Sequence, residues 1–242
     1  MASLREFYGF RSRFCWVAPL LLLAAVLVLF ECFPGWDIRI QDCFYSAERG
    51  WLVGGDDDKW LEFCYYQGPK IILIPLFVVL VLYSAWRTIR TRRVPWRHIY
   101  VLACLGAIPG VVAALKVGNS MPYPKKLVRY GGTEERRTVV EAFQWSRADG
   151  TRHYGGWPGG HASGGFALMG AAFAPEDPRR RRTGFLAATA LGFYMGIGHT
   201  IDGAHFFSHS LVSFCIAWLV AALLWRLLVM LQEHFQRRRC AG

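Results

Sequence analysis

The sequence predicts an all-α polytopic membrane protein, with six transmembrane helices in a bundle that forms a single membrane domain over residues 1–242. Two observations favour this fold class. Of the 242 residues, 54% are hydrophobic and 19% are charged, and the formal net charge is +11. A soluble domain of this length rarely combines these values. The hydrophobic residues also gather in long stretches separated by short arginine clusters.

Each predicted span is an apolar stretch without a run of charges. A helix needs on the order of 20 residues to cross the hydrocarbon core. The fourth stretch, between His161 and Pro175, is the shortest. The first has a basic start and an apolar core, as signal peptides do, but no small-residue cleavage site follows, so we interpret it as an uncleaved span. The stretches are Val17–Phe33, Ile71–Trp86, Ile99–Leu115, Ala162–Ala174, Phe185–Ile201 and Leu211–Met230.

The arginine clusters predict the orientation, because Lys and Arg are enriched in cytoplasmic loops close to span ends. Both termini are expected in the cytoplasm, and the loop with Asp56, Asp57 and Asp58, the loop 117–160 and the turn ending at His209 on the outer side. Since the clusters alternate with spans, the basic charge marks topology and indicates no nucleic-acid partner. The clusters are Arg5, Arg11 and Arg13; Arg87, Arg90, Arg92, Arg93 and Arg97; Arg179–Arg182; and Arg237–Arg239.

Two histidine-bearing segments fall on that outer side: Gly156-Trp157-Pro158-Gly159-Gly160-His161 and Gly203-Ala204-His205-Phe206-Phe207-Ser208-His209. Imidazole has an unperturbed pKa of about 6.5, so one ring can attack while another donates a proton. The glycines free backbone N–H groups at a helix start, which favours an anion. The two histidines of the second segment are four residues apart, a spacing that suits either two metal ligands or one ring orienting the other.

Basic residues accompany these segments. Lys116 ends the third predicted span on the outer side, where a lysine either snorkels to water or serves a polar function. The following loop is basic enough to attract an anionic headgroup. Within it, Arg129 beside Tyr130-Gly131-Gly132 is our candidate for phosphate binding. The loop's basic residues are Lys125, Lys126, Arg129, Arg136, Arg137, Arg147 and Arg152.

From Lys116 onward the chain resembles the type 2 phosphatidic acid phosphatase family of membrane enzymes, an acid phosphatase/haloperoxidase-like family. Its signatures are K-x6-R-P, P-S-G-H and S-R-x5-H-x3-D. The corresponding residues lie in the region 117–242 and just before it, in the same order and with the same spacing. They read Lys116 to Tyr123-Pro124, Pro158-Gly159-Gly160-His161, and Gly198-His199 with His205 and His209.

The resemblance implies a membrane lipid phosphatase, without metal or cofactor, that removes phosphate from a lipid phosphate or pyrophosphate at the outer leaflet of a bacterial inner membrane, with a periplasmic active site. It implies that His205 is the nucleophile that forms a phosphohistidine and that His161 is the general acid. His209 would orient His205, with Asp202 as a second candidate. The residues expected to bind the substrate phosphate are Lys116, Arg129, Gly159, Gly160 and His199.

Four residues depart from the signatures at positions that handle phosphate: Tyr123 and His199 stand at the two arginine positions, Gly159 at the serine of P-S-G-H and His209 at the aspartate. These departures keep three alternatives open. One is a lipid phosphotransferase, and another is a catalytically inactive lipid-binding or assembly protein. The third is a zinc hydrolase that uses His161, His199, His205 and His209. Separately, Cys43 and Cys64 share the first outer loop and would be able to pair in an oxidising compartment.

Overall fold

The computed structural model describes residues 14–54, 58–145 and 154–240, and over these residues the all-α prediction is confirmed. Several residues singled out above lie outside the described residues: Arg5, Arg11, Arg13, Asp56, Asp57, Arg147 and Arg152. The N-terminal half contains α1 (Phe14–Cys32), α2 (Gly35–Asp42), the strands β1 (Tyr45–Ser46) and β2 (Gly50–Trp51), α3 (Lys59–Glu62), the π-helical turn η3 (Phe63–Gln67) and α4 (Gly68–Thr91). The two strands pair antiparallel, Tyr45 with Trp51 and Ser46 with Gly50.

The C-terminal half begins with α5 (Trp96–Val117), followed by the 3₁₀ turns η4 (Pro124–Lys126) and η5 (Val128–Tyr130) and by α6 (Val139–Trp145). The chain continues through α7 (Gly160–Phe166), the 3₁₀ turn η6 (Ala167–Met169) and α8 (Gly170–Phe173). Two long helices complete it, α9 (Pro178–Ile201) and α10 (Phe207–Cys240).

Within the described residues, five helical segments are long and apolar enough to cross a membrane: Cys15–Cys32, Lys59–Thr91, Trp96–Val117, Pro178–Ile201 and Phe207–His234. The fourth predicted span, Ala162–Ala174, is instead three short segments, α7, η6 and α8. Glycine is a poor helix former, and this stretch contains four of them from Gly160 to Gly170. It is a broken helix in the structure, and the number of six crossings stays a prediction.

Close packing holds the broken helix against α9. A Cβ atom added at Gly165 would lie 2.6 Å from the backbone of Gly192, and one added at Gly192 would lie 2.0 Å from the Phe166 ring. Small residues allow helices to approach this closely inside a membrane, where packing is the main attraction between helices. The core around this contact includes Cys104, Phe166, Met169 and Cys215, all fully buried.

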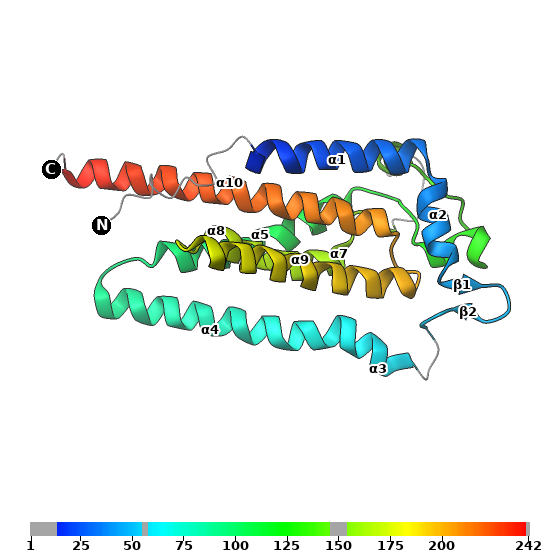
Figure 1. Cartoon of the computed structure of the whole chain (residues 1–242), viewed down its shortest axis with the longest axis horizontal. Helices are drawn as coiled ribbons and strands as arrows, with labels where there is room; N and C mark the ends of the chain where they lie inside the picture. The colour runs from blue at the N-terminus through cyan, green and yellow to red at the C-terminus, as the bar shows by residue number, and fades with distance from the viewer. Residues whose placement is uncertain (1–13, 55–57, 146–153, 241–242) are drawn as a thin grey trace.

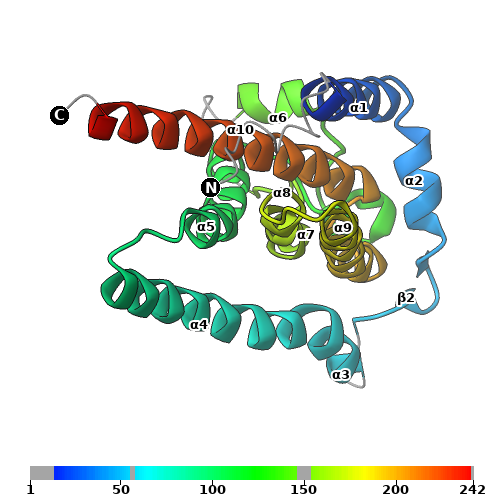
Figure 2. The same ribbon diagram turned by 60° about the vertical axis from the view of Figure 1, so that its left-hand side comes forward.

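The helices are arranged lengthwise, and the two ends of the bundle differ (Figure 1). The α4–α5 connection, the start of α9 and the end of α10 lie at one end, and these carry the described arginine clusters. The α9–α10 turn lies at the other end, together with α2, the two strands and α3. Helix α4 runs along the edge of the bundle (Figures 1 and 2), and many of its apolar side chains are exposed, among them Ile72 and Leu82. In a membrane, this face meets lipid.

Cys43 and Cys64 do not pair. Both are exposed free thiols, and the thiol of Cys43 donates to the carbonyl of Arg39, one helical turn earlier.

Candidate active site

The nucleophile predicted from the sequence, His205, lies buried in the tight turn between α9 and α10. Gly203 turns the chain with a φ of 72°, a conformation that L side chains rarely adopt. Trp51 packs so closely on Gly203 that an added Cβ would lie 2.5 Å from its indole. The backbone N–H of His205 then donates to the carbonyl of His199 over 2.8 Å. The turn is thus fixed from both sides, and it returns His205 toward the end of α9.

A backbone carbonyl orients the His205 ring. Its Nδ1 lies 2.9 Å from the carbonyl oxygen of Gly156. Because a carbonyl only accepts hydrogen bonds, Nδ1 carries the proton and Nε2 carries the free lone pair. Nε2 is buried and has no hydrogen-bond partner. Burial and the nearby Lys116 hold the pKa of His205 well below its usual value, so the ring is neutral. It has the tautomer that a nucleophile requires.

This geometry differs from the sequence prediction for His209. The His209 ring is close, with its centroid 5.8 Å from that of His205, but the Nδ1 of His205 is already bonded to Gly156. The orienting role therefore falls to a main-chain carbonyl, which a residue-type pattern does not reveal.

Three imidazoles meet at this point. The His161 centroid lies 5.6 Å from that of His205, within the roughly 10 Å that one bound phosphoryl group can bridge. His199 stacks on His161 with 3.7 Å between centroids and lies 6.3 Å from His205. Nδ1 of His161 and Nε2 of His199 are buried without hydrogen-bond partners, as is Nε2 of His205. The cluster thus offers three unengaged ring nitrogens close together.

Asp202 orients His199, not His205. Its carboxylate lies 3.0 Å from Nδ1 of His199 and accepts a hydrogen bond from the Tyr65 hydroxyl, also at 3.0 Å. Burial raises the pKa of Asp202, but hydrogen bonds from His199, Ala204 and Tyr65 outweigh it and hold the pKa below its ordinary value. The ionised carboxylate directs the free Nε2 of His199 away from itself. A histidine held by a carboxylate therefore stands where the signature has an arginine.

Lys116 ends α5 beside the histidines. Its ammonium would lie 3.0 Å from a Cβ added at Gly160, and it lies 6.0 Å from the centroid of the Tyr123 ring. The Tyr123 ring in turn packs edge-on against His205, with centroids 5.7 Å apart. Gly160 therefore leaves room for the ammonium group of Lys116. Tyr123, at the first arginine position of the signatures, forms an aromatic wall of the site.

Gly159 is placed differently from its predicted role. Its N–H donates to the carbonyl of His209 over 3.1 Å, so this amide is engaged within the protein. A Cβ at this position would lie 3.2 Å from the same carbonyl, which is tighter than most real contacts. A serine at this position would require the His209 carbonyl to move by a few tenths of an ångström.

Arg129 is not brought to the site. It forms a two-pronged ion pair with Asp42, at 2.9 and 2.7 Å, on the exposed surface. This pair holds the pKa of Asp42 below its ordinary value. Between the described residues, no contact joins Arg129 to the histidines. Its position next to two glycines belongs to a turn that packs against α2.

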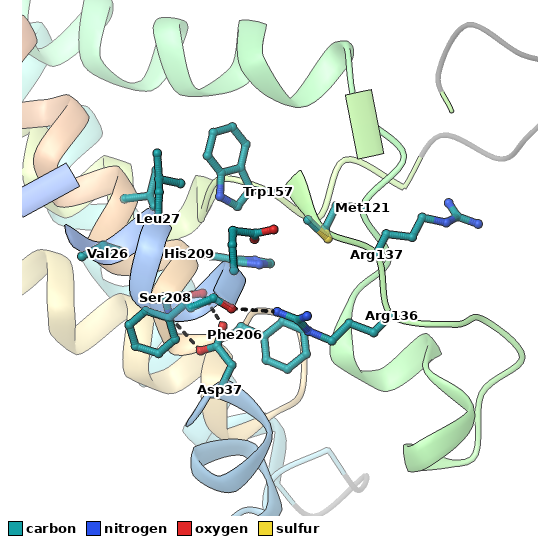
Figure 3. A pocket seen from close by; sticks show the side chains of 13 residues that line it. Val26, Leu27, Asp37, Met121, Arg136, Arg137, Trp157, Phe206, Ser208 and His209 are labelled. Carbon is teal, nitrogen blue, oxygen red and sulfur yellow. Dashed lines mark hydrogen bonds between the residues drawn. The ribbon is translucent and has the colours of Figure 1, made fainter. Parts of the chain in front are cut away.

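His209 also lines a pocket at the start of α10 (Figure 3). Asp37 of α2 is buried there and accepts hydrogen bonds from both the backbone N–H and the hydroxyl of Ser208. Arg136 reaches in from the loop before α6 and donates to the carbonyl of Phe30. Burial raises the pKa of Asp37 to about 6. The carboxylate caps the first turn of α10, the helix that carries His209.

Sequence reasoning missed Asp37, Tyr65 and Gly156. Asp37 and Tyr65 precede the signatures by many residues and reach the site only through folding. Gly156 acts through its carbonyl, so side-chain chemistry gives no signal for it. A carboxylate close to the end of the apolar stretch Val17–Phe33 was the signal in the sequence that could have indicated Asp37. As for metals, no cluster of three or more His, Cys, Asp or Glu residues suited to a metal ion occurs in the parts of the chain that the structure describes.

Comparison with known proteins agrees with the signatures. A profile of the PAP2 superfamily matches residues 95–233, more than half of the chain. The chain is also similar to the Lipid A 4'-phosphatase of Francisella tularensis subsp. novicida (strain U112), with 25% identity over 229 residues that cover 89% of this chain and 98% of that protein. No solved structure matches it significantly. The chain therefore belongs to the PAP2 superfamily and is an integral membrane phosphatase.

Proposed function

We propose that this phosphatase removes phosphate from a lipid phosphate through a phosphohistidine at His205. One observation carries the proposal: the hydrogen bond from Nδ1 of His205 to the Gly156 carbonyl leaves the lone pair of Nε2 free beside His161. The ring centroids of His161 and His205 are 5.6 Å apart. A nucleophile and an acid on either side of a transferring group are what phosphoryl transfer through a covalent intermediate requires.

In the first step, Nε2 of His205 attacks phosphorus and the bond from phosphorus to the lipid oxygen breaks. His161 gives its proton to that oxygen. In the second step, His161 takes a proton from a water molecule, the water oxygen attacks phosphorus and the bond from phosphorus to Nε2 of His205 breaks. Inorganic phosphate leaves, and both histidines return to their starting states. Lys116, Gly160 and His199 stabilise the negative charge on the phosphate oxygens. His199 does so through Nε2, with Asp202 fixing its ring.

The similar protein from Francisella tularensis is named as a lipid A phosphatase, so a lipid A phosphate is the first substrate to test. The arginine clusters at the far end of the bundle support an inner-membrane enzyme whose histidine end faces the periplasm, at the outer leaflet. A phosphotransferase remains the second candidate, because a lipid hydroxyl can take the place of water in the second step.

The test uses purified protein and a panel of lipid phosphates, with and without added lipid acceptors and a chelator. Phosphate release in water without an acceptor supports the phosphatase, while release that depends on an acceptor supports the transferase. Brief reaction with radiolabelled substrate should leave acid-labile label on the wild type and none on His205→Ala. Label that persists on His205→Ala would reject the mechanism, and a zinc hydrolase would lose activity with the chelator.

Orientation is tested in intact cells with an impermeant thiol reagent. Cys43 is exposed at the histidine end and should react, while Arg181→Cys, in a chain with Cys32, Cys43 and Cys64 replaced by Ser, should not. If the introduced cysteine reacts from outside, the proposed orientation is wrong.

A further inference from the structure

The π-helical turn η3 brings tyrosines to the histidine cluster from outside the signature region. The ring centroid of Tyr66 lies 4.7 Å from that of His161 and 5.2 Å from that of His199, and both contacts are edge-on. Tyr65 packs against His199 at 5.1 Å. Short π-helical turns occur frequently at functional sites. The start of α4 is therefore one wall of the site.

Lys70, in the first turn of α4, places its ammonium 3.4 Å from the centroid of the Tyr66 ring. This is a close cation–π contact. The same ring touches His161 and His199, so the ammonium is one aromatic ring away from both imidazoles. Lys70 and Lys116 both act electrostatically on His161. Among the described residues, Lys70 has no salt bridge with a carboxylate.

A lysine at the end of a membrane-spanning helix ordinarily extends its ammonium toward water. Lys70 instead rests on a ring that belongs to the site. The Lys70 side chain is half-buried, and ionisable residues in membrane-spanning helices generally mark a function. Lys70 therefore has the position expected of a ligand for a negatively charged group.

The site also has fewer cationic side chains than the signatures provide. With Tyr123 and His199 at the two arginine positions, Lys116 is the one lysine or arginine that the signatures supply. Transfer of a phosphoryl group depends on cations that neutralise its equatorial oxygens. The candidate from the outer loop, Arg129, is engaged by Asp42. An additional cation near His161 would meet this need.

We propose that Lys70 is a phosphate-binding residue of this enzyme, a cation that α4 supplies in place of the signature arginine, and that Tyr66 holds it toward His161. The proposal rests on the proposed phosphatase function. Lys70 donates from its ammonium to a non-bridging oxygen of the substrate phosphate, while Lys116 serves the same group from the α5 side.

The experiment compares full-length wild type, Lys70→Met, Lys70→Arg and, as a matched control, Lys126→Met, whose lysine is exposed on the outer loop. Orthovanadate, a phosphoryl-transfer analogue, is the probe, and its binding is measured by calorimetry alongside KM for the lipid phosphate. Loss of one charge-assisted hydrogen bond should weaken vanadate binding and raise KM on the order of 10- to 100-fold in Lys70→Met. Lys70→Arg should recover most of the loss, and Lys126→Met should match the wild type.

Vanadate affinity and KM within twofold of wild type in a folded Lys70→Met would overturn the proposal. A second pair of variants covers the case in which Lys70→Met does not fold: Tyr66→Phe keeps the ring face under the ammonium and should bind vanadate normally, while Tyr66→Leu should bind it more weakly. Equal binding by both would also overturn the proposal.

The role of Lys70 and the phosphohistidine mechanism can be rejected separately. A wild type that hydrolyses lipid phosphate with a Lys70→Met variant of equal KM and vanadate affinity rejects the role of Lys70 alone. A wild type that forms no labelled phosphoenzyme rejects the proposed mechanism, while vanadate binding still decides whether Lys70 holds an oxyanion.

Discussion

Asp177 and Asp202 flank the two ends of α9, and they differ in burial and in hydrogen-bond partners. Asp177 is half exposed, accepts a hydrogen bond from the backbone N–H of Arg179, and lies beside the arginine cluster. Asp202 is largely buried and binds His199, Tyr65 and the backbone N–H of Ala204. Asp177 thus meets water at the arginine end, whereas Asp202 binds its partners in the interior at the histidine end. Substitution of Asp202 should therefore disturb function far more.

The largest expected effect is at His205. Replacing this residue with Ala removes the proposed nucleophile, and turnover should fall by about 10⁴-fold or more, as loss of a covalent nucleophile does in other enzymes. Arg180→Ala, at the exposed end of α9, should leave turnover unchanged. Phosphate release by purified variants, matched for elution in detergent, measures both. A His205→Ala enzyme that keeps more than a tenth of wild-type turnover would contradict the contrast between the ends.

A smaller effect is expected at Asp202. Asp202→Asn keeps the shape but removes the charge that holds the His199 ring, and loss of such a supporting partner typically lowers activity by about 10- to 100-fold. Asp177→Asn is the matched control at the other end, and its kcat/KM should equal that of the wild type. Should both substitutions lower kcat/KM equally, the bond between Asp202 and His199 has no special role in the reaction.

The titration of Asp37 should make the stability of the protein depend on pH. Burial raises its pKa to about 6 from 3.8, so the folded protein holds this proton more tightly than the unfolded chain does. The stabilisation is complete below pH 3.8 and is lost as the pH rises to about 6. At about 1.4 kcal/mol per pKa unit, the loss amounts to about 3 kcal/mol.

Thermal unfolding in detergent at pH 4.5 and pH 6.5 measures this effect as the difference between wild type and Asp37→Asn, because other carboxylates titrate in both proteins. The neighbouring charges Glu31 and Arg136 are the same in both. If the difference in stability between the two proteins is constant over this range, Asp37 does not titrate as described.

The smallest effect is at the arginine end. Asp177→Ala removes the N-cap of α9, which should lower stability by about 1 kcal/mol and leave turnover intact. Asp177→Asn can still accept the bond from Arg179 and should be nearly as stable as the wild type. Melting temperature and phosphate release together check this, and a loss of turnover would show that the two ends are coupled.

The sequence predicted the parts of this molecule whose signal is local. Long apolar stretches predicted five of the helices, and the residues that the signatures single out, Lys116, His161 and His205, lie near one another in the fold. The fourth span failed as a continuous helix, because glycines that permit close packing on α9 also break the helical run. Hydropathy measures transfer into lipid and does not register packing against a neighbour.

Contacts between residues far apart in the sequence could not be predicted. Asp202 was read as a partner for His205, but the turn at Gly203 reverses the chain and leaves the carboxylate beside His199. Arg129 was our candidate for phosphate binding, but it pairs with Asp42, which lies on α2 far earlier in the chain. Such pairings depend on how helices are placed in space, which residue spacing alone does not determine.

The broken helix α7–η6–α8 has a consequence for biogenesis. Its central residues Phe166, Ala167 and Met169 are almost completely buried in the protein, so little of the segment's apolar surface is available to lipid. A stretch this short and glycine-rich has weak affinity for the bilayer by itself. We expect the insertion machinery to retain it until α9 has been synthesised, so that the two enter the membrane together as a hairpin. The second half of the enzyme would then be completed only after the α9 sequence leaves the ribosome.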